Sequence, residues 1–227
     1  KDSKLVAVMR RNAEKAKDYA RRHNVHKWYS DANQLIHDPE VNAIYIATPP
    51  DSHAQYTRMA AEAGKAVYVE KPMAKTYAEC LSMIQVCKQW DVPLFTAYYR
   101  RQLPNFLKIK SLLSEGIIGD IRYVNILLNK TLHPDILGAN GSKSNWRILP
   151  EISGGGYFFD LACHQLDILD FLFGPIQDAT GFAFNQSNQY AAEDIVTGSF
   201  YFNNKIIGQG NWCFTTSGIS DKEMTTI

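Results

Sequence analysis

The sequence has little net charge, no closely paired cysteines and no long apolar run. Its 227 residues include 24 Lys and Arg against 23 Asp and Glu, a formal net charge of +1. That charge is too small to attract nucleic acid or an acidic membrane surface. The apolar runs are too short to span a bilayer, and no signal peptide is evident. The four cysteines form no CxxC pair, which disfavours a zinc knuckle and favours a reducing, cytoplasmic setting.

The sequence signatures of several enzyme classes are also missing. The chain contains no Walker-type phosphate loop, no GxSxG nucleophile turn and no HExxH metal motif. No glycine-rich turn follows its first predicted strand, although such a turn usually cradles the phosphates of a dinucleotide. With 45% hydrophobic and 21% charged residues, the composition is nevertheless that of a globular protein with a sizeable core.

Short apolar runs alternate with helical patterns in the first hundred residues. The predicted strands cover 4–9, 42–48, 66–70 and 94–98. The helices between them begin at residues whose side chains can cap a helix, namely Asn12, Asp31, Asp51 and Thr76. Apolar strands that alternate with helices indicate a parallel sheet covered on both faces, as in doubly wound α/β domains. Such sheets bind ligands at the carboxyl ends of their strands.

The pattern changes after Tyr98. An amphipathic helix over 103–115 and a strand over 121–130 precede an irregular polar segment over 133–145. Further strands are predicted over 176–185, 194–202 and 205–215, and Asn203-Asn204 joins the last two in a tight hairpin. Strands joined in this way indicate a mostly antiparallel sheet with helices on one face. We therefore predict two domains, residues 1–100 and 101–227, with the change near 99–104.

Three consecutive glycines at 154–156 predict a turn or a close approach of two backbones, and a helix follows them to Phe173. On that helix Asp160 and His164 are four residues apart and share one face. Such a pair can transfer protons, because the carboxylate orients and stabilises the imidazolium. In the structural alternative, Asp160 is a favourable first-turn charge and His164 pairs with Asp167. The three side chains could also bind a metal, but no further ligand is evident.

Polar segments follow the predicted parallel strands, where ligands are expected. Arg10 and Arg11 stand where an acid would bind the ribose of NAD, and an arginine there suits the 2′-phosphate of NADP. Residues 48–53 lead into a helix N-terminus, which can hold polar or anionic groups. Lys71 follows a buried strand directly and can donate to a ligand in the crevice. The simpler alternatives are a solvated basic patch, a helix cap and a loop lysine.

The order of these motifs resembles the Gfo/Idh/MocA family, the relatives of glucose–fructose oxidoreductase and inositol dehydrogenase. The matching segments are Glu70-Lys71-Pro72, and Gly154-Gly155-Gly156 followed by Asp160, His164 and Asp167, together with Thr48-Pro49-Pro50, His53, Tyr98, Arg100-Arg101 and Trp146-Arg147. The resemblance covers essentially the whole chain. It implies a Rossmann-type domain for NAD(P), then an α+β domain with a large, mostly antiparallel open sheet that contacts substrate and often forms an oligomer interface.

The resemblance also implies roles for single residues. Lys71 contacts substrate and the nicotinamide ribose, His164 donates or accepts the proton, and Asp160 assists it. The positions that match cofactor-lining residues are Thr48, Pro49, Pro50, His53 and Glu70. We expect Trp146, Arg147, Tyr157 and the 131–145 segment to shape the substrate pocket, and Trp146 and Arg147 to reach the cofactor as well. No metal is expected.

The sequence therefore predicts a cytoplasmic oxidoreductase that prefers NADP, with NAD as the other cofactor. It would move a hydride to or from a carbinol or carbonyl carbon of a sugar, cyclitol or dihydrodiol, as a homo-oligomer (dimer or tetramer) built through the second sheet. The family's first strand and glycine fingerprint, roughly thirty residues, are expected before Lys1, and more of the sheet after Thr216. The alternatives are a non-catalytic relative that binds a nucleotide or sugar, and an inactive fragment of such an enzyme.

Overall fold

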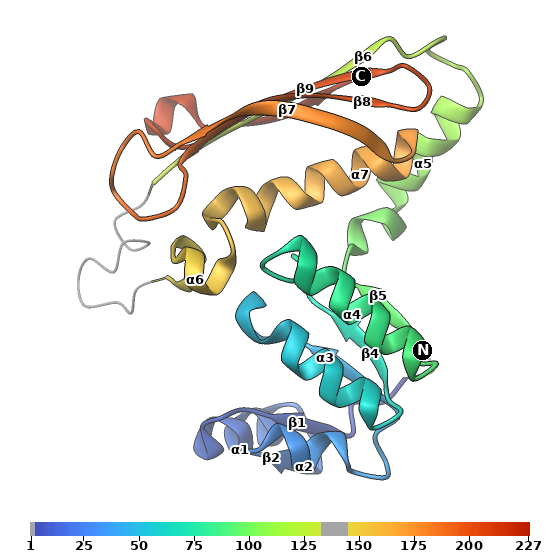
Figure 1. Cartoon of the computed structure of the whole chain (residues 1–227), viewed down its shortest axis with the longest axis vertical. Coiled ribbons are helices and arrows are strands. Elements are labelled where there is room, and N and C mark those ends of the chain that lie inside the picture. Colours follow the sequence, from blue (N-terminus) through green and yellow to red (C-terminus); the bar gives the residue numbers. More distant parts are fainter. Residues whose placement is uncertain (1–2, 133–144) are drawn as a thin grey trace. The chain divides into compact units, whose positions relative to one another are not determined.

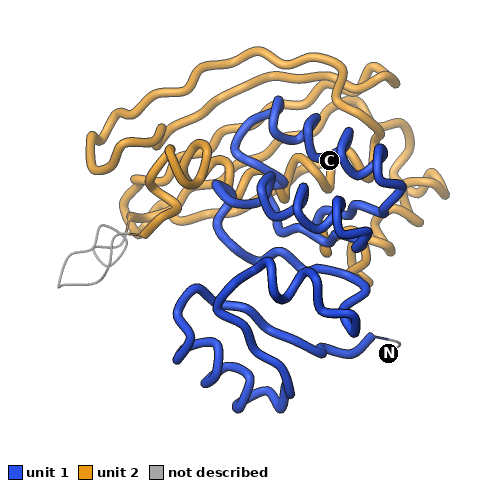
Figure 2. Tube along the Cα trace, turned by 60° about the horizontal axis from the view of Figure 1, so that its bottom comes forward, with its two compact units in different colours: residues 1–97 blue, residues 98–227 orange. Residues whose placement is uncertain are grey.

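The computed structural model describes residues 3–132 and 145–227. The chain forms two compact units, unit 1 up to Ala97 and unit 2 from Tyr98 onward, which Figure 2 distinguishes by colour. Each unit has a hydrophobic core of its own. The irregular segment predicted over 133–145 lies, apart from its last residue, outside the described residues. No helix in the described ranges combines the length and the apolar character that crossing a bilayer requires.

Unit 1 is an alternation of short strands and helices, as the sequence predicts (Figure 1). Its elements are β1 (Ala7–Met9), α1 (Ala13–Arg22), β2 (Lys27–Tyr29), α2 (Ala32–Ile36), β3 (Ala43–Ile46), α3 (His53–Glu62), β4 (Ala66–Val69), α4 (Tyr77–Gln89) and β5 (Leu94–Thr96). All strand pairs are parallel, in one sheet of order β1-β2 and another of order β3-β4-β5. The prediction of a parallel α/β unit is confirmed, although it missed β2.

Three of the four predicted helix caps are present. The Asn12 side chain accepts a hydrogen bond from the N–H of Lys15 at 2.9 Å, and Asp31 caps α2 in a similar way. Thr76 forms a complete capping box at the start of α4. The prediction for Asp51 is wrong. Pro50 starts a short 3₁₀ turn with its fixed φ angle, so Asp51 lies inside that turn and α3 begins only at His53.

The β3-β4-β5 sheet has two different faces. Side chains such as Ile44 and Val67 point into the core that α3 and α4 also fill. On the other face Tyr45, Tyr68 and Phe95 are register partners on the three strands and stay exposed. We expected cover on both faces, so this exposed face differs from the prediction; on it the Tyr45 hydroxyl donates a hydrogen bond to Glu70. The carboxyl ends of these strands, which carry the candidate site, lie at one edge of the sheet.

Unit 2 is a five-stranded sheet with helices against one face (Figure 1). Its helices and strands are α5 (Pro104–Ser114), β6 (Tyr123–Thr131), α6 (Pro150–Ser153), α7 (Cys163–Phe173), β7 (Ile176–Phe184), β8 (Ile195–Phe202), β9 (Ile207–Thr216) and β10 (Lys222–Thr226). The strand order is β10-β6-β9-β8-β7, and every neighbouring pair except β6–β9 is antiparallel. The mostly antiparallel sheet is confirmed, and β10 is a strand that the sequence did not predict.

The glycine turn before α7 is a tight approach of two segments. Gly154 and Gly156 have φ angles of 92° and 67°, which glycine adopts readily. A Cβ built on Gly156 would lie 2.5 Å from the Cβ of Ala192, so the loop before β8 packs directly on this turn. Both predicted reasons for glycine, the turn and the close approach, are confirmed. The helix then begins with a π-helical turn, Phe158–Ala162, before it becomes regular in α7.

Candidate active site

Lys71 lies in the turn that follows β4, at the carboxyl edge of the parallel sheet. The carboxylate of the preceding Glu70 accepts hydrogen bonds from the Tyr45 hydroxyl and from the backbone N–H of Lys71, the second at 3.2 Å. The peptide bond between Lys71 and Pro72 is cis. Lys71 is half-buried. The structure therefore places this lysine in an ordered turn where a parallel sheet binds ligands.

The Thr48-Pro49-Pro50 turn follows β3, the neighbouring strand, so the two strand ends lie side by side. His53 lies between them and is fully buried. Its Nε2 is 2.8 Å from the carbonyl oxygen of Thr48, and its Nδ1 is 3.1 Å from that of Pro72 and 3.2 Å from that of Met73. One ring thus connects the two turns that carry the predicted cofactor-site residues of unit 1.

Arg10 and Arg11 form the short connection between β1 and α1 and are both exposed. The Arg10 guanidinium lies 5.8 Å from the centre of the Tyr19 ring, and its backbone N–H donates to the Tyr29 carbonyl at 3.2 Å. Asn12, the cap of α1, follows directly. Two exposed cations at a helix N-terminus can bind an anionic group, because the backbone N–H groups there also favour negative charge.

His164 lies in the first turn of α7 and is 6% exposed. Its ring meets the edges of two aromatic side chains, Tyr98 at a centroid distance of 6.4 Å and Tyr99 at 5.7 Å. This packing fixes the orientation of the imidazole. The sequence matched Tyr98 to the family pattern but did not predict that it would contact His164.

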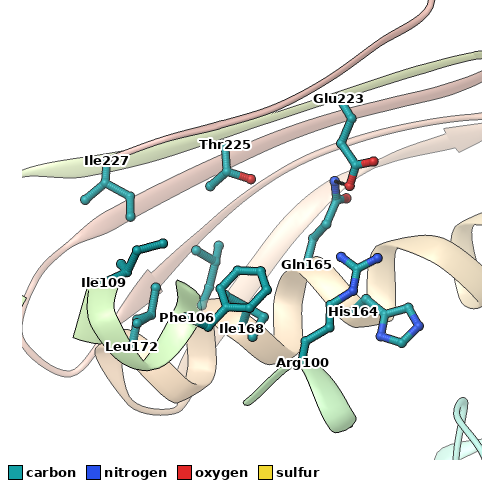
Figure 3. Close-up of a pocket in the computed structure, with 11 residues that line it drawn as sticks. Arg100, Phe106, Ile109, His164, Gln165, Ile168, Leu172, Glu223, Thr225 and Ile227 are labelled. Atoms are coloured by element: carbon teal, nitrogen blue, oxygen red, sulfur yellow. Dashed lines mark hydrogen bonds between the residues drawn. The ribbon is translucent and has the colours of Figure 1, made fainter. Parts of the chain in front are cut away.

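A pocket of about 160 Å³ opens beside His164 (Figure 3). Its other polar lining residues are Arg100, Gln165, Glu223 and Thr225. Its apolar wall is formed mainly by Phe106, Ile109, Ile168, Leu172 and Ile227. The Gln165 amide donates to Glu223 at 3.2 Å, and its oxygen accepts from the indole N–H of Trp212 at 2.7 Å. The residue next to His164 is therefore fixed to both β9 and β10.

Asp160 forms an ion pair with Arg147, whose Nε lies 3.0 Å from Oδ2 of the carboxylate. The Arg147 guanidinium also lies 4.4 Å from the centre of the Trp146 ring. The structure thus brings together Asp160, Arg147 and Trp146, three predicted site residues, through two contacts that the sequence did not predict. The prediction for Asp160 and His164 assumed α-helical spacing, whereas Asp160 lies in the π-helical turn, a feature often found at functional sites.

Asp167 pairs with Arg101. Its Oδ1 accepts from the Arg101 Nε at 2.9 Å and Nη2 at 2.5 Å, and Asp170 accepts from the same guanidinium at 3.1 Å. Burial raises the pKa of Asp167, and the arginine opposes that shift. The structure thus gives Asp167 an arginine partner, whereas the structural alternative had paired it with His164. An arginine on both Asp160 and Asp167 also opposes a metal ion, because the cations would repel each other.

Tyr157 follows the glycine turn and is half-buried. Its hydroxyl accepts a hydrogen bond from the Asn145 amide at 3.0 Å, and its ring packs 5.8 Å from that of Phe214. Burial raises the pKa of this tyrosine. Tyr157 lines a second pocket of about 250 Å³, whose other polar side chains are Lys130, Thr131 and Asp221. A half-buried phenol in a pocket wall is able to contact a polar ligand.

Within each unit, several contacts connect the candidate residues. In unit 1 the turns at 48–50 and 70–72 meet through His53, while Arg10 and Arg11 follow a strand of the other sheet. In unit 2, Asp160 lies with Trp146 and Arg147, and His164 lies with the tyrosines at 98 and 99. The sequence did not predict that Arg101 pairs with Asp167, although Arg100-Arg101 was one of the segments that match the family.

Comparison with known families matches two family models to the chain. Residues 1–98 match the model described as an oxidoreductase family with an NAD-binding Rossmann fold, and residues 106–226 match the GFO/IDH/MocA C-terminal domain. The chain belongs to the Gfo/Idh/MocA family. Members of this family are oxidoreductases, and the predicted resemblance is confirmed.

Two curated members and one solved structure illustrate the relationship. The chain is 41% identical over 226 residues to Oxidoreductase P35 of Formosa agariphila, covering 100% of this chain and 68% of that protein. It is 28% identical over 172 residues to the trans-1,2-dihydrobenzene-1,2-diol dehydrogenase of Xenopus laevis, covering 76% of this chain and 49% of that protein. A levoglucosan dehydrogenase solved with NADH and levoglucosan superposes with a TM-score of 0.85 at 27% identity, covering 97% of this chain and 60% of that one.

The chain therefore spans about half to two thirds of the length of these Gfo/Idh/MocA relatives. Its residues fit a nicotinamide dinucleotide in two places. The paired turns after β3 and β4 offer half-buried polar groups at a sheet edge, and the two exposed arginines after β1 offer charge for a phosphate.

Proposed function

We propose that the protein is an NADP(H)-preferring oxidoreductase acting on a sugar, cyclitol or dihydrodiol. It would transfer a hydride between nicotinamide and a carbinol or carbonyl carbon. The observation that carries this proposal is the Lys71 turn, held beside the Thr48-Pro49-Pro50 turn at the carboxyl edge of a parallel sheet. The names of two relatives, a dihydrodiol dehydrogenase and a levoglucosan dehydrogenase, support this range of substrates.

The residues that would hold the cofactor lie mainly at strand ends of unit 1, namely Arg10, Arg11, Thr48, Pro49, Pro50, Glu70 and Lys71, with His53 buried between two of these turns. Trp146 and Arg147, in a 3₁₀ turn of unit 2, complete the set. The bound cofactor supplies the hydride acceptor or donor. The two guanidinium groups favour the 2′-phosphate of NADP, and the turn after β1 offers no carboxylate for the ribose of NAD.

His164 takes or gives the proton of the substrate hydroxyl in this proposal. The rings of Tyr98 and Tyr99 keep its imidazole in one orientation. Asp160 assists by placing negative charge near the imidazole, and its contact with Arg147 fixes that carboxylate. The Lys71 ammonium stabilises negative charge that develops on the substrate oxygen.

The proposal is tested first by titrating the protein with NADPH and with NADH while following tryptophan and nicotinamide fluorescence. The four tryptophans give a usable signal. We expect saturable binding with a lower dissociation constant for NADPH, followed by turnover with members of a polyol, sugar and dihydrodiol panel. Binding without turnover across the panel would contradict the catalytic part of the proposal.

The alternative function is that of a non-catalytic relative, or an inactive fragment of such an enzyme. Ligand binding without any redox change would support the non-catalytic relative. Absence of binding to either nucleotide would support the inactive fragment.

We further propose a homo-oligomer, a dimer or tetramer, built through the open face of the second sheet, and a cytoplasmic location. Phe182 and Phe184 are exposed on β7 and stack with their ring planes 8° apart, and further along the sheet the register partners Tyr201 and Ile207 are exposed on β8 and β9. An apolar patch on this scale favours association. Sedimentation analysis with Phe182→Asp tests the oligomer, with a shift toward monomer expected.

The cysteines support the proposed cytoplasmic location. None of the four, all of which the structure describes, forms a disulfide, as suits a reducing compartment.

A further inference from the structure

We propose that His53 is a positioning residue for Lys71: its ring locks the turn after β4 onto the turn after β3. Lys71 then keeps its place at the edge of the sheet. The proposal deepens the proposed function, on which it rests insofar as Lys71 acts on the substrate. It gives His53 a part in the cofactor site that does not require its ring to touch a ligand.

The two turns are poor in backbone donors. Pro49, Pro50 and Pro72 carry no N–H, so three of the peptide units near the strand ends cannot donate a hydrogen bond. Buried carbonyl oxygens nevertheless need donors, and leaving one unsatisfied is unfavourable. A side chain with ring nitrogens on two sides is therefore well suited to this place in the fold.

The His53 ring lies between these carbonyls and has two nitrogens, so it donates on both sides as an imidazolium and on one side as a neutral ring. Its Nε2 is 2.8 Å from the Thr48 carbonyl oxygen, within the turn that precedes α3. Its Nδ1 faces the carbonyl oxygens of Pro72 and Met73 at 3.1 Å and 3.2 Å, in the turn one strand away. These carbonyls flank Lys71 on its C-terminal side, so the ring fixes the backbone immediately next to that lysine.

The His53 ring is buried, which holds its contacts with the two turns in place. His53 is 0% exposed and is the first residue of α3, a ten-residue helix packed in the core of unit 1. A side chain on a regular element holds its partners more exactly in place than one on a loop. Because no part of the ring reaches solvent, any effect of His53 on a ligand must pass through the turns that it holds. It is therefore a positioning residue and not a catalytic one.

The test uses three variants of His53 in the full 227-residue chain. His53→Leu removes both polar contacts. His53→Asn keeps an amide near the place of Nδ1, facing Pro72 and Met73, and His53→Gln keeps one near the place of Nε2, facing Thr48. Two controls lie on the same helix. Thr57→Val replaces a buried hydroxyl that has no hydrogen-bond partner in the described part of the chain, and Ala60→Gly weakens α3 without touching either turn.

The first readout is amide hydrogen exchange over residues 71–75. We expect exchange there to rise about tenfold or more in His53→Leu, to be largely restored in His53→Asn and to stay raised in His53→Gln. The second readout is steady-state kinetics. We expect kcat to fall about tenfold to a hundredfold in His53→Leu, with a smaller change in KM, because a displaced catalytic group lowers turnover. The two control variants should leave exchange over 71–75 and kcat close to those of the parent.

Unchanged exchange and kcat in a folded His53→Leu would overturn the proposal. So would an equal rise of exchange in Ala60→Gly, since the effect would then reflect weakening of the helix in general. If His53→Leu does not fold, the contrast between the Asn and Gln variants decides: equal exchange over 71–75 in both overturns the positioning role. If Lys71→Ala keeps full turnover, the proposed function of Lys71 fails, while the exchange measurements still decide whether His53 holds the turn.

Discussion

Asp167 on α7 accepts two hydrogen bonds from Arg101, at 2.9 Å from Nε and 2.5 Å from Nη2, although 66 residues separate them in the sequence. The side chain of Asp167 is 6% exposed and that of Arg101 is 35% exposed. This pair ties the segment that opens unit 2 to the helix that carries His164. A buried carboxylate paired in this way depends on its partner more than a surface ion pair does.

We therefore predict that Arg101→Met destabilises the protein by about 2–4 kcal/mol, because it leaves the Asp167 carboxylate buried without its cation. Adding Asp167→Asn to that variant should recover part of the loss, since the uncompensated charge is removed. Urea unfolding followed by circular dichroism measures both. The matched control is Asp170→Asn, whose side chain is 41% exposed and should cost less than about 1 kcal/mol. Equal losses in the two single variants would contradict this account.

The loss of folding stability at low pH should depend on Asp38 in unit 1. Hydrogen bonds from Lys27, from the Glu40 N–H and from the Tyr29 hydroxyl lower the pKa of this carboxyl from 3.8 to about 2. A carboxyl whose pKa is lower in the folded state stabilises that state above its unfolded pKa, and this contribution is lost as the pH falls. We expect the urea midpoint to fall between pH 4 and pH 2, and to fall less steeply in Asp38→Asn.

The control for that measurement is Asp18→Asn. Arg22 and Arg21 also lower the pKa of Asp18, but its side chain is 47% exposed on the surface of α1. Solvent screens such a pair, so its removal should change the fall of the urea midpoint between pH 4 and pH 2 much less. An Asp38→Asn curve that runs parallel to that of the parent between pH 4 and pH 2 would show that Asp38 does not titrate in this window.

The glycine turn offers a test of close packing. Gly156→Ala adds a Cβ that would lie 2.5 Å from the Cβ of Ala192, at a φ angle of 67°. Gly64→Ala has nearly the same φ, 68°, but meets nothing within 4 Å, so it serves as the matched control. Both variants pay for the left-handed backbone, roughly 1–2 kcal/mol. Gly156→Ala should cost about 1–3 kcal/mol more from overpacking. Equal losses in thermal unfolding would exclude a close approach at this turn.

Cofactor preference should depend on the two arginines after β1. Arg10→Ser with Arg11→Ser should weaken NADPH binding about tenfold or more and leave NADH binding nearly unchanged, because only the former carries a 2′-phosphate. The control is Arg21→Ser, which removes an exposed arginine from the last turn of α1, the helix that follows Arg10 and Arg11. Fluorescence titration gives all the dissociation constants. An equal loss for both nucleotides would place the arginines outside the 2′-phosphate site.

Sequence alone predicted the elements whose signals are local. The capping box of Thr76 and Glu79, the cap of Asn12 and the glycine turn each depend on neighbours along the chain. The strands β2 and β10 were missed because neither carries an apolar run: Lys27–Tyr29 begins with a lysine, and Lys222–Thr226 has one apolar residue. Both exist because another strand pairs with them, which is a tertiary effect.

The candidate site shows the same division. The sequence singled out Lys71 as a candidate from its place after a strand, and His164 from its place on the helix that follows the glycine turn. The partners could not be predicted in this way. Asp160 pairs with Arg147, and the His53 ring faces three carbonyl oxygens. Both contacts depend on how separate segments pack. Long-range pairing carries no signature at fixed spacing.

Turnover itself should depend on Lys71 and His164. We expect Lys71→Met and His164→Asn each to lower kcat by about 100-fold or more, the usual contribution of a positioned acid or base, with little change in the unfolding midpoint. Lys71→Arg should retain more activity than Lys71→Met, because it keeps a positive charge at the turn. The control for the histidine is His23→Asn, an exposed ring that stacks on Tyr19 at 4.2 Å. Because His164→Asn removes proton transfer and leaves the strand ends in place, its nucleotide titrations should stay within a few-fold of the parent. Full activity in either variant would remove that residue from the proposed mechanism.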